Sequence, residues 1–322
     1  MMDAISTGSV SLDHLIRGHS SYTGKPQCPG IPRGRITEIY GEENTGKTTV
    51  ALSTAAKCQE SGGSVCYLDF NCALDPSYVQ KLGVETAGDN WHYFMPTTWE
   101  QGAEIIKVMV KKGVDLIVVD SVPSMMTEKG LNTRLLGGDF QEQVKELARL
   151  QSEFLPFLTE ELYQSNTAVV YLNELRDWLD QGARTCGGMV LKYYTSLRIE
   201  LKKHEVKYHP ELVREDGDLY KIPLSTTIMA RGVKNMVSSH GGHTAPFVLR
   251  HCEGIDNLST VMTIAENREI IRKVNGHFVF EDANGNSQSF PSLENLRAYF
   301  LEHTTRFKSF TEQVSSSKAS TS

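Results

Sequence analysis

The sequence predicts an α/β fold, in which a mostly parallel, twisted sheet is flanked by helices and followed by a small C-terminal α+β domain. Apolar runs alternate with helical patterns over the first two thirds of the chain, which is typical of parallel strands joined by covering helices. From about Thr260 the pattern changes to short helices around a hairpin-like segment. These two observations indicate one large core and a smaller second unit.

The individual elements follow from the same periodicities. We expect strands at residues 35–40, 65–70, 115–120, 167–173, 195–201, 226–233 and 246–250, and helices from Thr48 onward, at 100–112 and at 140–163. The smaller unit should contain helices at 266–274 and 291–300 and a hairpin at 276–287 that turns at Asn284 and Gly285. This predicts a lead-in at 1–34, a core at 35–258, a C-terminal domain at 259–305 and a disordered tail at 306–322.

A glycine-rich segment, GEENTGKTT, connects the first core strand to the first core helix and fits the phosphate-binding pattern GxxxxGK[ST]. Backbone N–H groups of such a loop cradle phosphates, while its lysine and hydroxyl reach the outer phosphates and Mg²⁺. The alternative, a glycine-rich turn with a chance lysine, does not require these two flanking elements. The expected nucleotide-binding residues are Gly41, Glu42, Glu43, Asn44, Thr45, Gly46, Lys47, Thr48 and Thr49.

Two further segments complete the predicted nucleotide site. The apolar strand at 115–120 ends in Asp120, an arrangement that places a carboxylate beside the loop to hold Mg²⁺ through water, so Thr48 and Asp120 are the expected metal residues. A cap-forming aspartate is the alternative. Asp75 before Pro76 is an ordinary helix start, but a second interpretation has Tyr78 stacking on adenine and Asp75 accepting from its amino group. Spacing alone does not choose between them.

Composition restricts the function classes. With 322 residues, 39% of them hydrophobic, the chain can bury a sizeable core, and no apolar run approaches the roughly 20 residues of a membrane span. We therefore expect a soluble, cytoplasmic protein without a membrane partner. The 6 cysteines are far apart, which favours free thiols over disulfides or a structural metal site. A net charge of −6 disfavours whole-surface attraction to nucleic acid, so any DNA site must be local.

Several segments of the chain follow one another in an order that is typical of one family: ISTGSVSLDHLI, PRGRITEIYGEENTGKTT, YLDFNCALDPSYVQKLGV, DLIVVDSV, QSNTAVVYLNELR and CGGMVLKYYTSLRIE. They resemble the RecA recombinases of bacteria and phages, and the resemblance runs from Ile5 to about His303. It implies a RecA-type core that binds ATP at a subunit interface, polymerises on single-stranded DNA and pairs it with a homologous duplex. Lys47, Thr48 and Asp120 match the family's phosphate and Mg²⁺ residues, and Asp75 and Tyr78 match its adenine contacts.

The resemblance also implies two DNA-binding loops, at 127–139 and 175–188. Arg149, Arg176, Gly187 and Gly188 fall on DNA-contact positions of the family. The residues themselves support the second loop, because cations and an aromatic on flexible backbone suit phosphates and splayed bases. They are Arg176, Trp178 and Arg184. An ordinary solvated loop is the alternative, which Asp177 and Asp180 favour.

Three positions at the predicted catalytic centre depart from the family's pattern. Its catalytic glutamate is replaced by Asn71, and its γ-phosphate-sensing glutamine by Glu174. An amide cannot accept a proton, so hydrolysis should be weakened unless Glu174 supplies the missing base. Of the family's two lysines across the subunit interface, Lys234 is retained and the other is Met236.

Other departures concern assembly. The family's N-terminal docking arm would precede Ile5, where only four residues stand, and its acidic tail is absent, so we expect weaker self-assembly that relies on the core, including Tyr193. These features leave two function hypotheses. The first is an ATP-dependent protein of homologous recombination and DNA repair that binds single-stranded DNA and hydrolyses ATP slowly. It would take double-stranded DNA as a second partner and form homo-oligomers or filaments. The alternative is a non-hydrolysing paralogue that assists another recombinase. An unrelated helicase core is disfavoured by the LDPSY and QSN segments.

Overall fold

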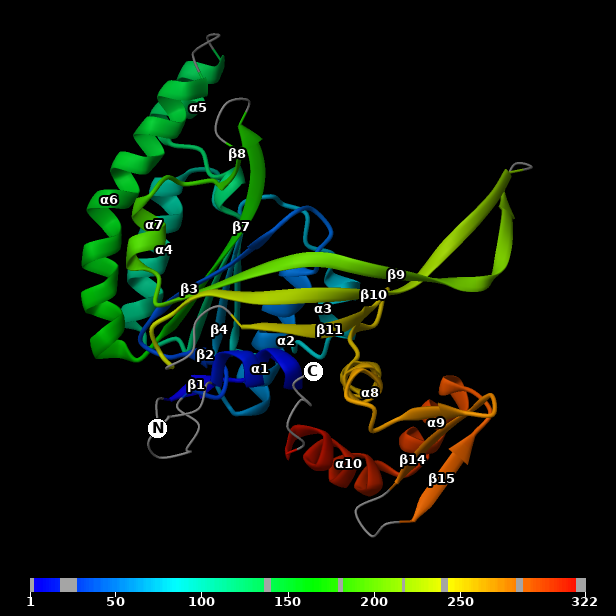
Figure 1. The fold of residues 1–322 in the computed structure, drawn as a ribbon. Helices are drawn as coiled ribbons and strands as arrows, with labels where there is room; N and C mark the ends of the chain where they lie inside the picture. Colours follow the sequence, from blue (N-terminus) through cyan, green and yellow to red (C-terminus); the bar gives the residue numbers. More distant parts are fainter. Residues whose placement is uncertain are drawn as a thin grey trace.

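The computed structural model of the chain describes residues 3–17, 28–135, 140–178, 182–215, 218–238, 243–281 and 286–316. One large sheet runs through the core in the order β12-β11-β10-β9-β3-β7-β6-β4-β5, with β8 attached to β7 (Figure 1). Its strands are β3 (Ile36–Gly41), β4 (Val65–Asp69), β5 (Trp91–Phe94), β6 (Leu116–Asp120), β7 (Ala168–Trp178), β8 (Gly182–Thr185), β9 (Leu197–Glu215), β10 (Asp218–Asn235), β11 (Thr244–Arg250) and β12 (Gly254–Ile255). Strands β3, β4, β5, β6, β7 and β9 are parallel, which confirms the predicted α/β fold.

Helices cover both faces of this sheet. One face packs against α1 (Val10–Arg17), α2 (Lys47–Glu60) and α3 (Pro76–Lys81), and the other against α4 (Trp99–Lys111), α6 (Phe140–Ser165) and α7 (Val190–Tyr194). The alternation within β6 is direct: Leu116 and Val118 enter the first core, and Ile117 and Val119 the second. Strands that are buried on both faces read as continuous apolar runs, which is why the sequence located them. Strands β1 (Ala4–Ile5) and β2 (Ile31–Pro32) pair beside the first core.

The C-terminal part of the described chain has its own apolar core. Its elements are α8 (Asn257–Asn267), β13 (Arg272–Val274), β14 (His277–Glu281), β15 (Ser287–Phe290), α9 (Leu293–Glu302) and α10 (Thr304–Ser316). The predicted hairpin and second helix are present as β14–β15 and α9, while Asn284 and Gly285 lie outside the described residues. The backbone N–H of Val248 in β11 donates to Thr260 Oγ1 at 2.9 Å, which joins α8 to the core sheet.

The helix predicted at 266–274 is wrong. Asp256 caps α8 instead, because its side chain accepts the backbone N–H of Ser259 at 3.0 Å, and the helix ends at Asn267. Its apolar side chains recur at helical spacing and enter the small core: Leu258, Val261, Met262 and Ala265. The segment after it turns and forms β13.

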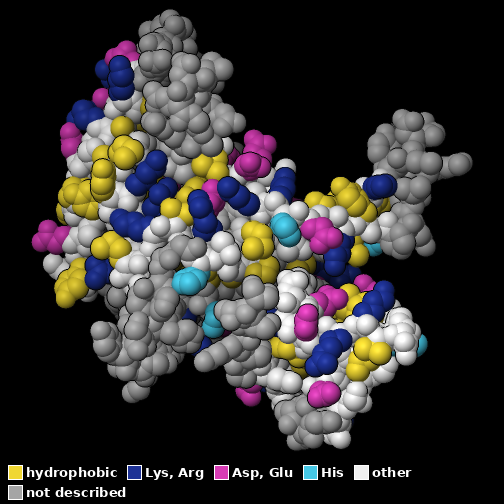
Figure 2. All heavy atoms as spheres, viewed as in Figure 1, with side chains coloured by type: hydrophobic (Ala, Val, Ile, Leu, Met, Phe, Trp, Pro, Cys, Tyr) yellow, Lys and Arg dark blue, Asp and Glu magenta, His cyan; other side chains and the backbone are white. Residues whose placement is uncertain are grey.

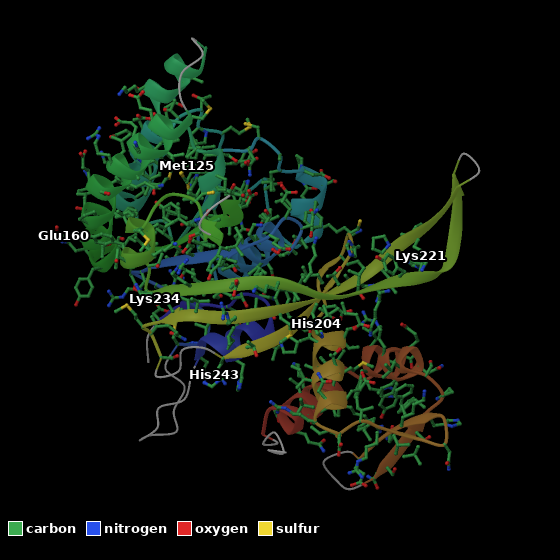
Figure 3. All side chains as sticks on the ribbon, turned by 45° about the horizontal axis from the view of Figure 1, so that its top comes forward. Met125, Glu160, His204, Lys221, Lys234 and His243 are labelled. Atoms are coloured by element: carbon green, nitrogen blue, oxygen red, sulfur yellow. The ribbon has the colours of Figure 1, made fainter. Side chains whose placement is uncertain are left out.

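Two other segments differ from the predictions. Residues 306–316, predicted to be disordered, belong to α10, whose Phe310 and Val314 are buried in the small core. Strands β9 and β10 continue beyond the predicted ranges as a two-stranded ribbon that leaves the sheet, with His204 and Lys221 on it and Lys234 toward the other end of β10 (Figure 3). Where the side chains of the ribbon are described, exposed and charged residues on both faces, such as Lys202, Lys203 and Glu205, gave no apolar pattern to detect. None of the described helices has both the length and the apolar character of a membrane span.

The placement of Phe310 predicts that α10 stabilises the C-terminal core. Its ring is 2% exposed, 4.9 Å from the centroid of Phe300 and 5.1 Å from that of Phe280. Phe310→Ala should therefore lower the free energy of unfolding of this unit by about 3–5 kcal/mol. Chemical denaturation checks this. Leu301→Ala, at a side chain that is 59% exposed, is the control and should change it by less than about 0.5 kcal/mol. Equal small effects would contradict the assignment of α10 to the core.

Candidate nucleotide site and DNA-binding hairpin

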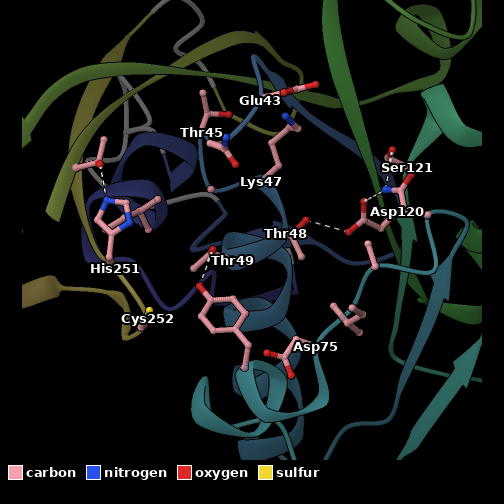
Figure 4. Close-up of a pocket in the computed structure, with 18 of the residues that line it drawn as sticks. Glu43, Thr45, Lys47, Thr48, Thr49, Asp75, Asp120, Ser121, His251 and Cys252 are labelled. Atoms are coloured by element: carbon pink, nitrogen blue, oxygen red, sulfur yellow. Dashed lines mark hydrogen bonds between the residues drawn. The ribbon is translucent and has the colours of Figure 1, made fainter. Parts of the chain in front are cut away.

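The phosphate-binding loop lies between β3 and α2, at the edge where the parallel strands end (Figure 4). Asn44 and Gly46 have positive φ angles of 56° and 82°. A Cβ atom on Gly46 would lie 2.1 Å from Leu249 Cδ1, and one on Gly41 would lie 2.2 Å from the carbonyl oxygen of Leu201. Gly41 is needed because the backbone of β9 approaches too closely for a side chain, and Gly46 because its positive φ angle strains any other residue. The loop thus directs the N-terminus of α2 into the open space, where it favours an anion.

Lys47 spans its own loop. Its Nζ atom donates to the carbonyl oxygens of Gly41 at 3.1 Å and Glu42 at 2.7 Å. Burial lowers the pKa of Lys47, while the nearby carboxylates of Glu174 and Asp120 oppose that shift. The lysine is thus a cation held beside the N-terminus of α2, at the place that the outer phosphates of a nucleotide require.

Asp120, at the end of β6, is hydrogen-bonded to α2 and to β4. Its Oδ2 atom accepts the hydroxyl of Thr48 at 2.9 Å and that of Tyr67 at 2.6 Å. Burial raises the pKa of Asp120, and these two hydrogen bonds oppose the shift. A hydroxyl and a carboxylate that meet in this way form an all-oxygen pair, which fits Mg²⁺ held partly through water and substrate phosphates. In the described part of the chain, no group of three or more His, Cys, Asp or Glu side chains could hold a metal ion alone.

Asn71 follows β4 and lies beside this carboxylate. Its Nδ2 atom is 3.4 Å from Asp120 Oδ1 and 3.3 Å from Ser121 Oγ, and its Oδ1 atom accepts the hydroxyl of Ser124. Both ends of the amide are therefore engaged by residues at the end of β6. This arrangement orients the side chain, but an amide offers no site for a transferred proton.

A cavity of about 580 Å³ brings most of the predicted nucleotide residues together. Its lining includes Glu43, Asn44, Thr45, Gly46, Lys47, Thr48, Thr49, Asn71, Asp75, Tyr78, Asp120 and Glu174. Gly41 and Glu42 contribute through their carbonyl bonds to Lys47. Sequence reasoning missed a further wall of the cavity, formed by Thr226, Leu249, Arg250, His251 and Cys252. For Leu249 to Cys252 the sequence signal was their position directly before the EGI segment, and Thr226 lies far from it in the chain.

One end of the cavity has the features expected for an adenine pocket. The Tyr78 hydroxyl is 2.9 Å from Thr49 Oγ1, which holds the ring against α2. Asp75 caps α3 by accepting the backbone N–H of Ser77 at 2.9 Å, and the hydrogen bonds from Ser77 lower the pKa of Asp75. The helix-cap interpretation of Asp75 is thus confirmed, while its contact with adenine stays a prediction. His251 faces this region, with its Nε2 atom 2.9 Å from Thr226 Oγ1 (Figure 4).

The remaining two predicted catalytic residues occupy different places. Glu174 lies in β7 and pairs in register with Gly41, so it lines the cavity. Lys234 lies outside it, and its Nζ atom donates to the carbonyl oxygens of Lys192 and Tyr193, both at 2.9 Å. Within one chain Lys234 therefore does not reach the nucleotide site. A role across a subunit interface stays a prediction for this residue.

The second predicted DNA loop is largely a hairpin. Strands β7 and β8 are antiparallel, and Arg176 pairs directly with Arg184, while Trp178 pairs with Gly182. By this register the positions 176, 178, 182 and 184 share one face of the hairpin. The first predicted loop also differs, because Glu128–Leu135 form α5; residues 136–139 and 179–181 lie outside the described part. DNA contact by these residues stays a prediction.

The base of the hairpin packs against α6. A Cβ atom on Gly188 would lie 3.3 Å from Ala148 Cβ, so the Gly187–Gly188 turn approaches α6 at the residue before Arg149. The Arg149 guanidinium is bound to Glu146 at 3.0 Å and to Glu153 at 2.5 Å. A DNA phosphate at this position would have to compete with two carboxylates. Lys and Arg side chains nevertheless gather over α7 and the base of β7 (Figure 2).

Comparison with known proteins gives a consistent result. A profile of the RecA N-terminal domain matches residues 1–241. Protein RecA of Mycoplasma mobile is 34% identical over 319 residues, which cover 95% of this chain and 86% of that protein. Protein RecA of Clostridium beijerinckii is 32% identical over 308 residues, or 94% of this chain and 76% of that protein. Protein RecA of Deinococcus radiodurans is 35% identical over 292 residues, or 87% and 72%. With the phosphate loop, the Thr48–Asp120 pair and the parallel sheet in place, the chain belongs to the RecA family.

Proposed function

We propose that this protein is an ATP-dependent recombinase of the RecA type, which binds single-stranded DNA in homologous recombination and DNA repair and hydrolyses ATP slowly. The observation that carries the proposal is the single cavity in which the phosphate loop, the Thr48–Asp120 pair and Tyr78 converge. Its volume of about 580 Å³ lies within the range of small-ligand sites. Membership of the RecA family supports ATP as the nucleotide.

ATP would extend along this cavity from the loop toward Tyr78. The N-terminus of α2 and Lys47 would bind the outer phosphates, and the Tyr78 ring would contact the base. Thr48 and Asp120 would hold Mg²⁺, which when bound offsets the negative charge of the phosphates. The Lys47 ammonium has three N–H donors, of which two are directed at the carbonyl oxygens of Gly41 and Glu42, so a phosphate oxygen would accept the third.

Asn173 supports a connection between this cavity and DNA binding. Its Nδ2 atom donates to the carbonyl oxygen of Cys186 at 2.9 Å and to Glu38 Oε1 at 2.8 Å. Cys186 follows β8, and Glu174, the next residue after Asn173, lines the cavity. A change in position of Glu174 on nucleotide binding would thus act directly on the base of the hairpin. This favours DNA binding that depends on ATP.

A second candidate function is a non-hydrolysing paralogue that assists another recombinase. The specific observation in its favour is Asn71, whose amide replaces a proton acceptor and is hydrogen-bonded to Asp120 and Ser121. Electron microscopy of the protein with ATP and single-stranded DNA separates the two. Regular helical filaments support the recombinase, while binding without filaments, together with lengthened filaments of a second recombinase, supports the accessory.

The proposed nucleotide site is tested at Lys47. Lys47→Ala should weaken ATP binding at least about tenfold, because a charged hydrogen bond to phosphate contributes roughly 1.5–3 kcal/mol. Isothermal titration with Mg²⁺-ATP measures the change in Kd. Lys57→Ala is the matched control, since Lys57 lies in the same helix and pairs with Glu60 at 2.7 Å on the surface. An unchanged affinity in the Lys47 variant would refute the nucleotide site.

The second prediction concerns the hairpin. Replacing Arg176, Trp178 and Arg184 together by alanine should weaken single-stranded DNA binding in the presence of ATP. The slope of log K against log salt should become shallower by about 1.4, because two phosphate contacts are lost. Fluorescence anisotropy over a salt series measures both. Lys111→Ala with Lys112→Ala, which removes two cations at the end of α4, should leave the slope unchanged. Equal slopes for the parent and the triple variant would exclude the hairpin as the DNA site.

A further inference from the structure

The end of the cavity that would hold the γ-phosphate is lined by the amide of Asn71 and the carboxylate of Glu174. Each stands at a position where the family resemblance implies the other kind of group. The resemblance to RecA recombinases implies a glutamate and a glutamine at the positions that Asn71 and Glu174 hold in this chain. Both residues line the same cavity with Lys47 and Thr48. The cavity therefore still has a carboxylate that could act as a base, but this carboxylate belongs to Glu174 in β7 and not to the residue after β4.

The contacts of Asn71 suit a structural amide. Its Nδ2 atom lies within 3.4 Å of Asp120 Oδ1 and its Oδ1 atom accepts from Ser124, so each end matches a neighbour of the opposite polarity. A glutamate here would place a second negative charge beside the buried Asp120 carboxylate, which is unfavourable. The amide removes that repulsion and leaves the site without a base on this side.

Glu174 lines the same cavity from β7. Along the edge of the sheet the strand ends follow the order β3, β7, β6 and β4, which places Glu174 between the phosphate loop and Asp120. Its backbone N–H donates to Asn173 Oδ1 at 2.9 Å. Among the charges that act on Lys47, the carboxylate of Glu174 is the strongest that opposes the lowering of the lysine pKa by burial. Because Lys47 and Glu174 line the same cavity, a phosphate bound by Lys47 would occupy the space that Glu174 borders.

We propose that Glu174 is the general base of ATP hydrolysis in this chain, an assignment that rests on the proposed ATP-dependent function. The oxygen of a water molecule forms a bond to the γ-phosphorus, and the bond from that phosphorus to the bridging oxygen breaks with its electron pair on ADP. The water proton passes to the Glu174 carboxylate and then to solvent, and ADP and inorganic phosphate leave. Lys47 offsets the repulsion between Glu174 and the triphosphate, and Asn71 orients Asp120.

The test compares single-turnover hydrolysis of ATP, with saturating single-stranded DNA, in four proteins. Glu174→Gln should lower the rate about 10²–10⁴-fold, the usual contribution of a general base. The double variant Asn71→Glu with Glu174→Gln restores the arrangement that the family resemblance implies. Its hydrolysis rate should be at least about tenfold higher than that of Glu174→Gln, because a general base is present again. Glu104→Gln, at an exposed carboxylate paired with Lys107 on α4, is the matched control and should match the parent.

Binding of a non-hydrolysable ATP analogue, measured by titration, is the second readout. Glu174→Gln should bind it as tightly as the parent or more tightly, because a charge that repels the triphosphate has been removed. A rate in Glu174→Gln equal to or above that of the parent would overturn the proposal, as would a double variant that binds the analogue but regains no rate. A parent that binds ATP and DNA without hydrolysing ATP would also overturn it and would support the non-hydrolysing paralogue, while ATP-dependent DNA binding would stand.

Discussion

The buried carboxylate of Asp120 is the interaction on which the nucleotide site depends. One oxygen accepts the hydroxyls of Thr48 and Tyr67, and the other lies 3.4 Å from the amide of Asn71. A buried carboxylate is costly unless it is hydrogen-bonded, so the structure is most stable when all three donors are in place. These donors come from α2, from β4 and from the segment after β4. A single group therefore fixes the positions of α2, of the Thr48–Asp120 pair and of the Asn71 amide relative to one another.

The parallel sheet explains why these residues meet. In such a sheet the carboxyl ends of the strands lie along one edge, where ligands of open α/β sheets bind. The register places Asp69 opposite Asp120 and Gly41 opposite Glu174. Residues at the ends of apolar runs in four strands are thus brought to one edge of the sheet, although they are far apart in the chain. Asn71 and Glu174 line the same cavity only because the strands that carry or precede them are aligned in this register.

A second buried carboxylate, that of Glu38, connects the cavity to the β7–β8 hairpin through hydrogen bonds. Glu38 in β3 has no exposed surface, and it accepts from Arg198 at 2.5 Å and from Asn173 at 2.8 Å. The Arg198 guanidinium also lies 4.8 Å from the centroid of the Tyr40 ring. Because removal of one partner of a buried pair leaves an uncompensated charge, this network holds β3, β7 and β9 together. The base of the β7–β8 hairpin is attached to it through Asn173, one residue from the cavity.

The local patterns predicted the phosphate loop, Asp120, the cap at Asp75 and the buried strands, because each depends on a few consecutive residues or on a strand that is apolar on both faces. The wall formed by Thr226, Leu249, Arg250, His251 and Cys252 was missed, since no local pattern indicates that a distant strand closes a cavity. Helix α8 was placed too late, and α10 was taken as disorder, because their apolar residues have a partner only in the folded C-terminal core. Chemical identity and strand position follow from the order of residues along the chain. Contacts between segments that are distant in the chain decide which side chains share a cavity, which charges neutralise one another and which ends of the chain are packed. Those contacts form only when the sheet has assembled.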